Sequence, residues 1–310
     1  MSSIRHELRR AGRADDVAAV QGLSNGPVSD IWLVTYQDGS RVVAKTSLGA
    51  PSDLLAVEAQ GLEALRKSGP VATVGVLGLT ECLLVLEPLA PRADTREAWQ
   101  AFAHDLAGLH SGTANDRFGW HRDGYLGWLR QENAWAENGH AFFADHRLLR
   151  YLHEPLVQEA LGPSDRRAIE RFCDRLPEIV PEMPAVLTHG DLWSGNILGG
   201  RDGRLVLIDP AVSYTWAEVD LSMLWCAPRP AAASYFFRRY QELNPSPPGW
   251  VERMPLLHLR EALSCIAHFA NRVDDVNYLR RTLAPFYSKA TATTPGPRPT
   301  PAVTGLGDGP

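Results

Sequence analysis

Three polar side chains that could take part in catalysis, His189, Asp191 and Asn196, lie within the stretch T-H-G-D-L-W-S-G-N-I-L at 188–198. A fourth, Asp209, follows further along the chain in I-D-P. Apolar residues on both sides of the first three predict short buried strands joined by a polar turn. A β-hairpin would bring Asp191, Asn196 and Asp209 to one end of a small sheet.

These side chains suit phosphoryl transfer. The oxygens of Asn196 and Asp209 predict a magnesium site, because hard cations bind carboxylate and amide oxygens together with nucleotide phosphates. Phosphoryl transfer also uses one carboxylate that accepts the proton of the attacking hydroxyl. We expect Asp191 to be this catalytic base and His189 to fix the loop backbone by hydrogen bonding.

The N-terminal part supplies a lysine and a glutamate for the same chemistry. Lys45 ends the run V-V-A-K, whose alternation points its side chain inward and which resembles the V-A-I-K strand of kinases. Glu58, in a helix predicted over 54–67, is its expected ion-pair partner. Taken singly, Lys45 could be a solvated strand end, Glu58 a surface charge and Asp209 a turn former. Their order along the chain favours a kinase site.

Two further segments are expected to meet a nucleotide. The stretch 22–30, with two glycines, predicts a turn-rich loop whose backbone amides could cover phosphates, although a plain hairpin turn would read the same way. Proline 88 breaks a strand and marks a hinge. The expected nucleotide contacts of these segments are Ser24, Asn25, Gly26, Glu87 and Leu89.

The predicted elements give an α+β chain with two lobes. Strands at 30–36, 41–46 and 82–86 with one helix form a small β-rich nucleotide-binding lobe at 1–88. A mainly helical catalytic and substrate lobe follows at 89–287, with helices predicted over 95–111, 141–162, 163–176, 231–243 and 251–272. The last residues, 288–310, are mostly Thr, Pro, Gly and Ala and predict a disordered tail.

Composition narrows the function classes. A length of 310 residues favours two lobes around a shared cleft, and a net charge of -5 gives no reason to expect nucleic acid or an anionic membrane as partner. Four separated cysteines without a C-x-x-C pair argue against disulfides and zinc. Neither a signal peptide nor a membrane-spanning apolar run is recognised, so we expect a cytoplasmic protein.

Several motifs together resemble one family. H-G-D-L-W-S-G-N and I-D-P-A-V are accompanied by F-G-W at 118–120, F-F-A-D-H-R-L at 142–148 and E-V-D-L at 218–221. Over residues 17–287 the chain resembles the fructosamine kinase (ketosamine 3-kinase) family, a branch of the aminoglycoside-phosphotransferase-like kinases with the protein-kinase-like fold. The tryptophan after the base and the F-F-x-x-H-R-L segment separate this branch from the broader group.

The resemblance implies an ATP-dependent kinase that phosphorylates a hydroxyl of ketosamines, free or protein-bound, in deglycation. It implies Asp191 as base, Asn196 and Asp209 as Mg²⁺ ligands, Lys45 as phosphate contact with Glu58 as its partner, and Asp220 as a brace for the catalytic loop. Trp193, beside the base, could stack on a sugar or an ammonium group, or simply pack.

Departures from the family lie on the presumed acceptor side. Family members commonly read D-P-A-V-Y-Y-G-H-R-E, whereas this chain has S-Y-T-W-A at 213–217, and a segment near H-x-N-x-F-G reads C-I-A-H-F-A at 265–270. A kinase for aminoglycosides or amino alcohols is therefore the alternative, and acidic residues in the acceptor site would favour it. A non-catalytic nucleotide-binding protein is the third possibility, and the intact Lys45, Asp191, Asn196 and Asp209 argue against it.

Overall fold

The computed structural model describes residues 2–25, 29–47, 49 and 51–287. Gly26 of the expected nucleotide loop and the predicted tail at 288–310 lie outside these residues. The N-terminal elements are α1 (Ser2–Arg10), β1 (Val17–Asn25), β2 (Asp30–Tyr36), β3 (Arg41–Thr46), α2 (Leu54–Ser68), β4 (Ala72–Thr73), β5 (Val76–Leu79) and β6 (Leu83–Leu86). Five of the strands form an antiparallel sheet in the order β1-β2-β3-β6-β5.

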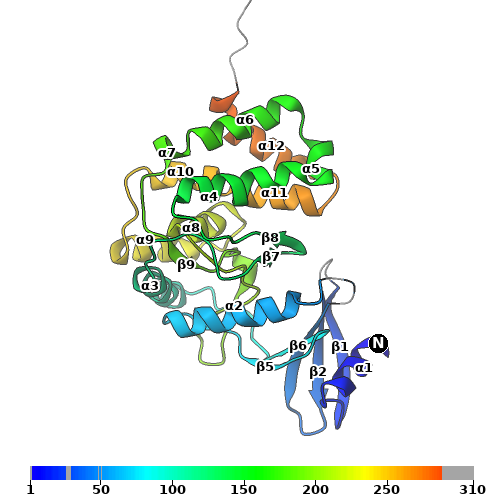
Figure 1. Ribbon diagram of the computed structural model, residues 1–310. Coiled ribbons are helices and arrows are strands. Elements are labelled where there is room, and N and C mark those ends of the chain that lie inside the picture. The colour runs from blue at the N-terminus through cyan, green and yellow to red at the C-terminus, as the bar shows by residue number, and fades with distance from the viewer. Residues whose placement is uncertain (1, 26–28, 48, 50, 288–310) are drawn as a thin grey trace, which may run out of the picture.

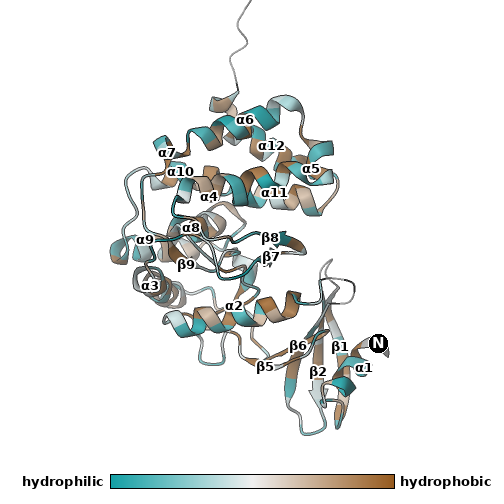
Figure 2. Ribbon diagram, in the orientation of Figure 1, coloured by the Kyte–Doolittle hydropathy of each residue, from teal (hydrophilic) through white to brown (hydrophobic). Residues whose placement is uncertain are grey.

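A helix covers each face of this sheet. Side chains alternate between the faces of a strand, so Leu83 and Val85 of β6 join one apolar cluster with α1, and the neighbouring β6 leucines join another with α2. Figure 2 shows the apolar residues along these strands. The prediction of a single helix in this lobe was wrong. Four of the nine residues of α1 are charged, and two buried apolar side chains one turn apart, Ile4 and Leu8, hold the helix against the sheet.

Both ends of the stretch 22–30, predicted as a loop, belong to strands. Strand β1 continues to Asn25, with Ser24 opposite Ile31 and Asn25 opposite Asp30 of β2. Pairing with β2 gives these backbone groups hydrogen-bond partners, and this outweighs the weak strand propensity of Gly, Ser and Asn. The prediction of a loop at residues 22–25 was therefore wrong.

The C-terminal region is mainly helical, as predicted, and lies beyond α2 in Figure 1. Its helices are α3 (Arg96–Gly112), α4 (Gly139–Phe143), a π-helix (Ala144–Leu148), a 3-10 helix (Leu149–His153), α5 (Pro155–Ala160), α6 (Pro163–Asp174), α7 (Leu176–Ile179), a 3-10 helix (Ser194–Asn196), α8 (Ala217–Cys226), α9 (Ala233–Leu243), α10 (Trp250–Leu257), α11 (Leu259–His268), α12 (Val273–Thr282) and a 3-10 helix (Ala284–Phe286). Its strands are β7 (Gly124–Leu126), β8 (Leu129–Gln131), β9 (Val186–Thr188), β10 (Ile197–Gly199), β11 (Leu205–Leu207) and β12 (Ser213–Thr215).

Two long predicted helices are interrupted. The segment 141–162 changes from α- to π- to 3-10 geometry, and Pro155 then begins a new helix, since proline suits a first helical turn. The segment 251–272 divides at His258 into α10 and α11. The strands β7, β8 and β12 were not predicted from their residue pattern, because each has only three residues. Helix α12 was not predicted either.

The strands around the H-G-D stretch belong to two different sheets. Strand β9 pairs with β12, whereas β10 pairs with β11, so the predicted turn joins strands that do not pair with each other. Strand β11 also pairs in parallel with β4, and Ala90 exchanges two hydrogen bonds with Gly199. The pairing of β11 with β4 ties the residues expected to do chemistry to the N-terminal region.

Among the described residues, none of the helices combines the length and the apolar composition needed to cross a bilayer.

Candidate active site

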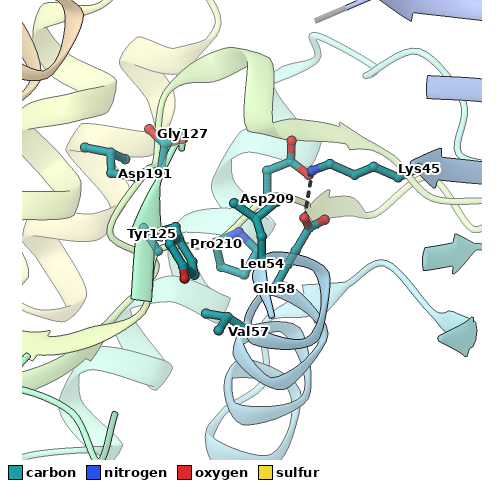
Figure 3. Close-up of a pocket in the computed structure, with 11 residues that line it drawn as sticks. Lys45, Leu54, Val57, Glu58, Tyr125, Gly127, Asp191, Asp209 and Pro210 are labelled. Atoms are coloured by element: carbon teal, nitrogen blue, oxygen red, sulfur yellow. Dashed lines mark hydrogen bonds and ion pairs between the residues drawn. The ribbon is translucent and has the colours of Figure 1, made fainter. Parts of the chain in front are cut away.

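The centre of the site is a lysine held between two carboxylates (Figure 3). Lys45 Nζ, at the end of β3, donates to Glu58 Oε2 of α2 at 2.7 Å and to Asp209 Oδ1 at 2.9 Å. The predicted ion pair between Lys45 and Glu58 is confirmed. Because side chains alternate along β3, Lys45 points toward α2, and the helix presents Glu58 to it.

The charges of this cluster are unequal. Burial works against the charged form of Lys45, but the carboxylates of Glu58 and Asp209 outweigh it and raise the lysine pKa. Burial raises the pKa of Glu58 well above its usual value. Burial also opposes ionisation of Asp209, yet the charge of Lys45 overcomes it and lowers the Asp209 pKa. Lys45 thus favours the ionised form of Asp209, while it also pairs with Glu58.

The backbone at Asp209 is unusual. Its φ is +52°, in the left-handed region that aspartate tolerates better than most residues. This conformation follows β11 and turns the carboxylate toward Lys45, leaving the side chain 35% exposed. A left-handed backbone that carries a carboxylate about one-third exposed is typical of a ligand-binding position.

Asp191 and Asn196 form a pair on the loop after β9. Asn196 Nδ2 donates to Asp191 Oδ2 and to the Asp191 carbonyl oxygen, each at 2.9 Å. Both of these bonds use the amide nitrogen, so Asn196 Oδ1 is the atom suited to a cation. Burial raises the pKa of the Asp191 carboxyl, and the nearby charge of Glu261 adds to this effect. A carboxylate with a raised pKa is a stronger proton acceptor.

The loop that carries Asp191 is fixed by a buried histidine. Asp191 N–H donates to His189 Nδ1 at 3.2 Å, so the ring proton lies on Nε2, which donates to the Ile208 carbonyl oxygen at 2.9 Å. Burial lowers the pKa of His189 and keeps the ring neutral. His189 thus connects the Asp191 loop with the strand that leads to Asp209, which agrees with the expected structural contact.

Asp220, at the start of α8, holds the same loop from the other side. Its two carboxylate oxygens accept from His189 N–H at 2.7 Å and from Gly190 N–H at 2.8 Å. Gly190 has φ +79°, and a Cβ there would meet the Ala211 carbonyl oxygen at 2.1 Å. Only glycine fits, because the loop backbone lies against the segment after Asp209.

Sequence reasoning missed the supports behind this loop. Asp220 also accepts from His110 Nε2 at 3.3 Å, and His110 Nδ1 lies 2.7 Å from the Tyr240 hydroxyl. Buried Arg260 of α11 donates to the Gly190 carbonyl oxygen at 2.6 Å and to Gln131 at 2.7 Å. The one available signal was a charged or polar residue within an apolar helical face, which does not say what the residue contacts.

The four predicted residues Lys45, Glu58, Asp191 and Asp209 line one cavity. Asn196 lies outside the cavity lining and reaches it through Asp191. The oxygens of Asp209 and Asn196 are of the kind that bind a hard divalent cation, and the lysine beside Asp209 is suited to nucleotide phosphates. An arrangement of one lysine, one helix glutamate and two further carboxylates around a cavity suits phosphoryl transfer.

Comparison with known proteins agrees with this chemistry. The model of the family described as Fructosamine kinase matches residues 1–283. The chain belongs to this family. It is therefore an ATP-dependent phosphotransferase with the protein-kinase-like fold.

Three relatives illustrate the match. A chloroplastic protein-ribulosamine 3-kinase of Oryza sativa subsp. indica is 28% identical over 270 residues, which cover 84% of this chain and 77% of the relative. A probable ketoamine kinase of Synechocystis is 33% identical over 213 residues, 67% of this chain and 70% of the relative. The crystal structure of a putative fructosamine-3-kinase from Thermobifida fusca is similar with a TM-score of 0.80 and 32% identity, covering 92% of this chain and 99% of that one.

The remaining predicted residues of this fructosamine kinase family member lie apart from the cavity wall. Glu87 Oε1 accepts from Gly75 N–H at 2.9 Å, and Leu89 packs beside the α2 cluster. Ser24 lies near the end of β1. Trp193 is 43% exposed, with its ring over Gly195, where a Cβ would meet it at 2.2 Å. The Trp193 ring is thus partly open to solvent.

Proposed function

We propose that this kinase uses ATP and Mg²⁺ to phosphorylate a hydroxyl of ketosamines, free or protein-bound, in deglycation. The observation that carries the chemistry is the convergence of Lys45, Glu58, Asp209 and Asp191 on one cavity. The acceptor class rests on family membership and on relatives named for ribulosamine and ketoamine phosphorylation. The 1–88 region would bind the nucleotide and the 89–287 region would supply the base and the acceptor site.

Each residue has a proposed task in this reaction. Asp191 accepts the proton of the acceptor hydroxyl, and Asn196 keeps the Asp191 carboxylate oriented through its amide. Asp209 and Asn196 would hold Mg²⁺ through oxygen atoms, and Lys45 would contact phosphate oxygens. When bound, ATP would supply the phosphoryl group and Mg²⁺ would neutralise the charge of its oxygens. His189 and Asp220 keep the loop in the geometry that transfer requires.

The alternative of an aminoglycoside or amino-alcohol acceptor has less support. Such cationic substrates would be matched by surplus acidic residues in the acceptor site. Among the described residues that line the cavity, the acidic ones are Glu58, Asp191 and Asp209, and each already has a proposed task in phosphoryl transfer. Glu261, whose charge acts on Asp191, has no such task and lies outside this lining. The test is a panel of ketosamines, free sugars and aminoglycosides, with phosphorus NMR of each product. Transfer to aminoglycosides but to no ketosamine would refute the proposed acceptor.

The lysine cluster gives a ranked prediction. Lys45→Met should lower kcat/KM by about two orders of magnitude or more, because it removes a positive charge aimed at the phosphates. It should also destabilise the fold by about 3–5 kcal/mol, since Glu58 loses its buried partner. Glu58→Ala should cost less activity, because Lys45 keeps its 2.9 Å contact with Asp209.

Steady-state kinetics and thermal unfolding would test this ranking. Glu63→Ala, an exposed change on the same helix that removes a surface ion pair with Lys67, is the matched control and should leave both readouts unchanged. A larger activity loss in Glu58→Ala than in Lys45→Met would mean that the glutamate acts independently of the lysine.

A substitution of Trp193 tests whether its side chain contacts the acceptor substrate. We expect Trp193→Ala to raise the KM of fructosamine or ribulosamine adducts of lysine more than the KM of ATP. The exposed ring follows the base by two residues and offers an aromatic face to the sugar and its cationic amine. Parallel KM measurements for both substrates decide the matter, and equal changes in the two values would assign Trp193 to loop packing alone.

A further inference from the structure

The β7–β8 hairpin occupies a position that none of the assigned roles explains. In Figure 1 it lies between α2 and α11. Leu126 and Gly127, at its tip, line the same cavity as Asp191 and Asp209. In Figure 3, Gly127 lies on the Asp191 side of this cavity, away from Lys45. The tip therefore faces the base, where the acceptor hydroxyl has to approach, and not the side that carries the lysine.

Two anchors hold the hairpin in this position. The Tyr125 hydroxyl donates to Asp53 Oδ1, just before α2, at 2.6 Å. At the tip, Trp128 N–H donates to His268 Nε2 of α11 at 3.3 Å, and the two rings lie 4.3 Å apart. His268 Nδ1 is 2.7 Å from the Ser264 carbonyl oxygen. The neutral ring with its proton on Nδ1 satisfies both contacts, because a carbonyl accepts and an amide N–H donates.

The close approach of Gly127 makes the tip depend on His268. Gly127 has φ +60°, and a Cβ built there would lie 2.3 Å from His268 Nε2. The tip backbone thus rests directly on the imidazole, and a side chain at this position would push the two apart. The imidazole consequently sets the height of the tip above α11, in addition to bonding it.

We propose that the β7–β8 hairpin forms the acceptor-side wall of the active site and that His268 is the positioning residue that holds its tip. That this side of the cavity receives the acceptor substrate rests on the proposed function. A base works only when the hydroxyl lies within about 3 Å of it, and a misplacement of about 1 Å lowers the rate strongly. The wall positions the acceptor, whereas Lys45 and Asp209, on the other side of the cavity, position the nucleotide.

Kinetics of His268 variants test the wall. His268→Leu removes the nitrogen acceptor and should raise the acceptor KM about tenfold while the ATP KM stays within about twofold. His268→Gln should restore most of the acceptor affinity, because its Oε1 can accept from Trp128 N–H. Gly127→Ala should reproduce the His268→Leu pattern with the imidazole intact. His104→Leu, an exposed change on α3, is the control and should match the wild type.

Hydrogen exchange tests the anchor without any substrate. His268→Leu should speed exchange of the Trp128 amide and of peptides covering 124–131, and His268→Gln should restore protection, while α3 peptides stay unchanged. Unchanged protection at 124–131 would overturn the anchor, and an equal rise in both KM values would overturn the wall. If the wild-type enzyme transferred no phosphoryl group to ketosamines, the proposed function would be refuted instead. Exchange would still decide the role of His268, and the KM comparison would use the acceptor that the panel identifies.

Discussion

Asp191→Asn should lower kcat by about 10²–10⁴-fold while the ATP dissociation constant changes by no more than a few-fold. The proposed base acts on the acceptor hydroxyl, so its loss affects proton transfer and not nucleotide binding. An asparagine has nearly the same shape, and its amide oxygen can still accept from Asn196 Nδ2, the contact of 2.9 Å that orients this residue. The backbone bond from residue 191 to His189 Nδ1 does not involve the side chain and should remain.

Stopped-flow or calorimetric ATP binding, combined with single-turnover transfer, separates these two effects. Asp202→Asn, in the turn between β10 and β11, removes another loop carboxylate and should preserve kcat. A parallel loss of ATP affinity in Asp191→Asn would show that Asp191 holds the nucleotide or its metal, and the base would then have to be sought elsewhere.

The lysine–glutamate pair could be predicted because local periodicity determines it. Alternation along the strand points Lys45 to one face, and the helical stripe of 54–67 fixes which face of the helix is buried. The one remaining assumption is that the strand and the helix lie side by side in space, and the small separation of the two elements in the chain favours this. The Lys45–Glu58 distance of 2.7 Å confirms the prediction.

The supports of the catalytic loop could not be predicted from local patterns. Asp220 bonds to His110, which lies 110 residues away in sequence, and Arg260 reaches Gly190 across 70 residues. In the sequence, Asp220, His110 and Arg260 each look like one polar residue among apolar neighbours. Their partners follow from how α3, α8 and α11 pack around the loop, and a single sequence does not give that packing. The family resemblance supplied Asp220 alone.

Short elements were the other source of error. The β7 and β8 strands have three residues each, too few for an alternating pattern, and the tip Gly127-Trp128 resembles an ordinary loop. Helix α1 has too few apolar residues to produce a clear stripe. Both elements owe their conformation to tertiary contacts, the hairpin to Asp53 and His268 and the helix to the sheet. Tertiary contacts outweigh local propensity in both cases.

Asp209→Ala should abolish productive binding of the metal–nucleotide complex. The charge of Lys45 lowers the pKa of Asp209, the Asp209 side chain is 35% exposed to solvent, and the neutral oxygen of Asn196 cannot replace its charge. Asp209→Asn is the sharper variant. Asparagine also tolerates the positive φ of +52°, so the backbone is preserved and only the charge is lost.

Titrations of ATP with and without Mg²⁺ separate the metal contribution from direct contacts. In the wild type, Mg²⁺ should strengthen ATP binding, and in both Asp209 variants this gain should disappear, with kcat/KM reduced by about 10²-fold or more. Because Lys45 keeps Glu58 at 2.7 Å, the lysine should remain in place, and any remaining ATP affinity should reflect phosphate contacts alone. If the Mg²⁺ dependence of Asp209→Asn matched that of the wild type, the cation would be held by other residues, and Asp209 would serve only to position Lys45.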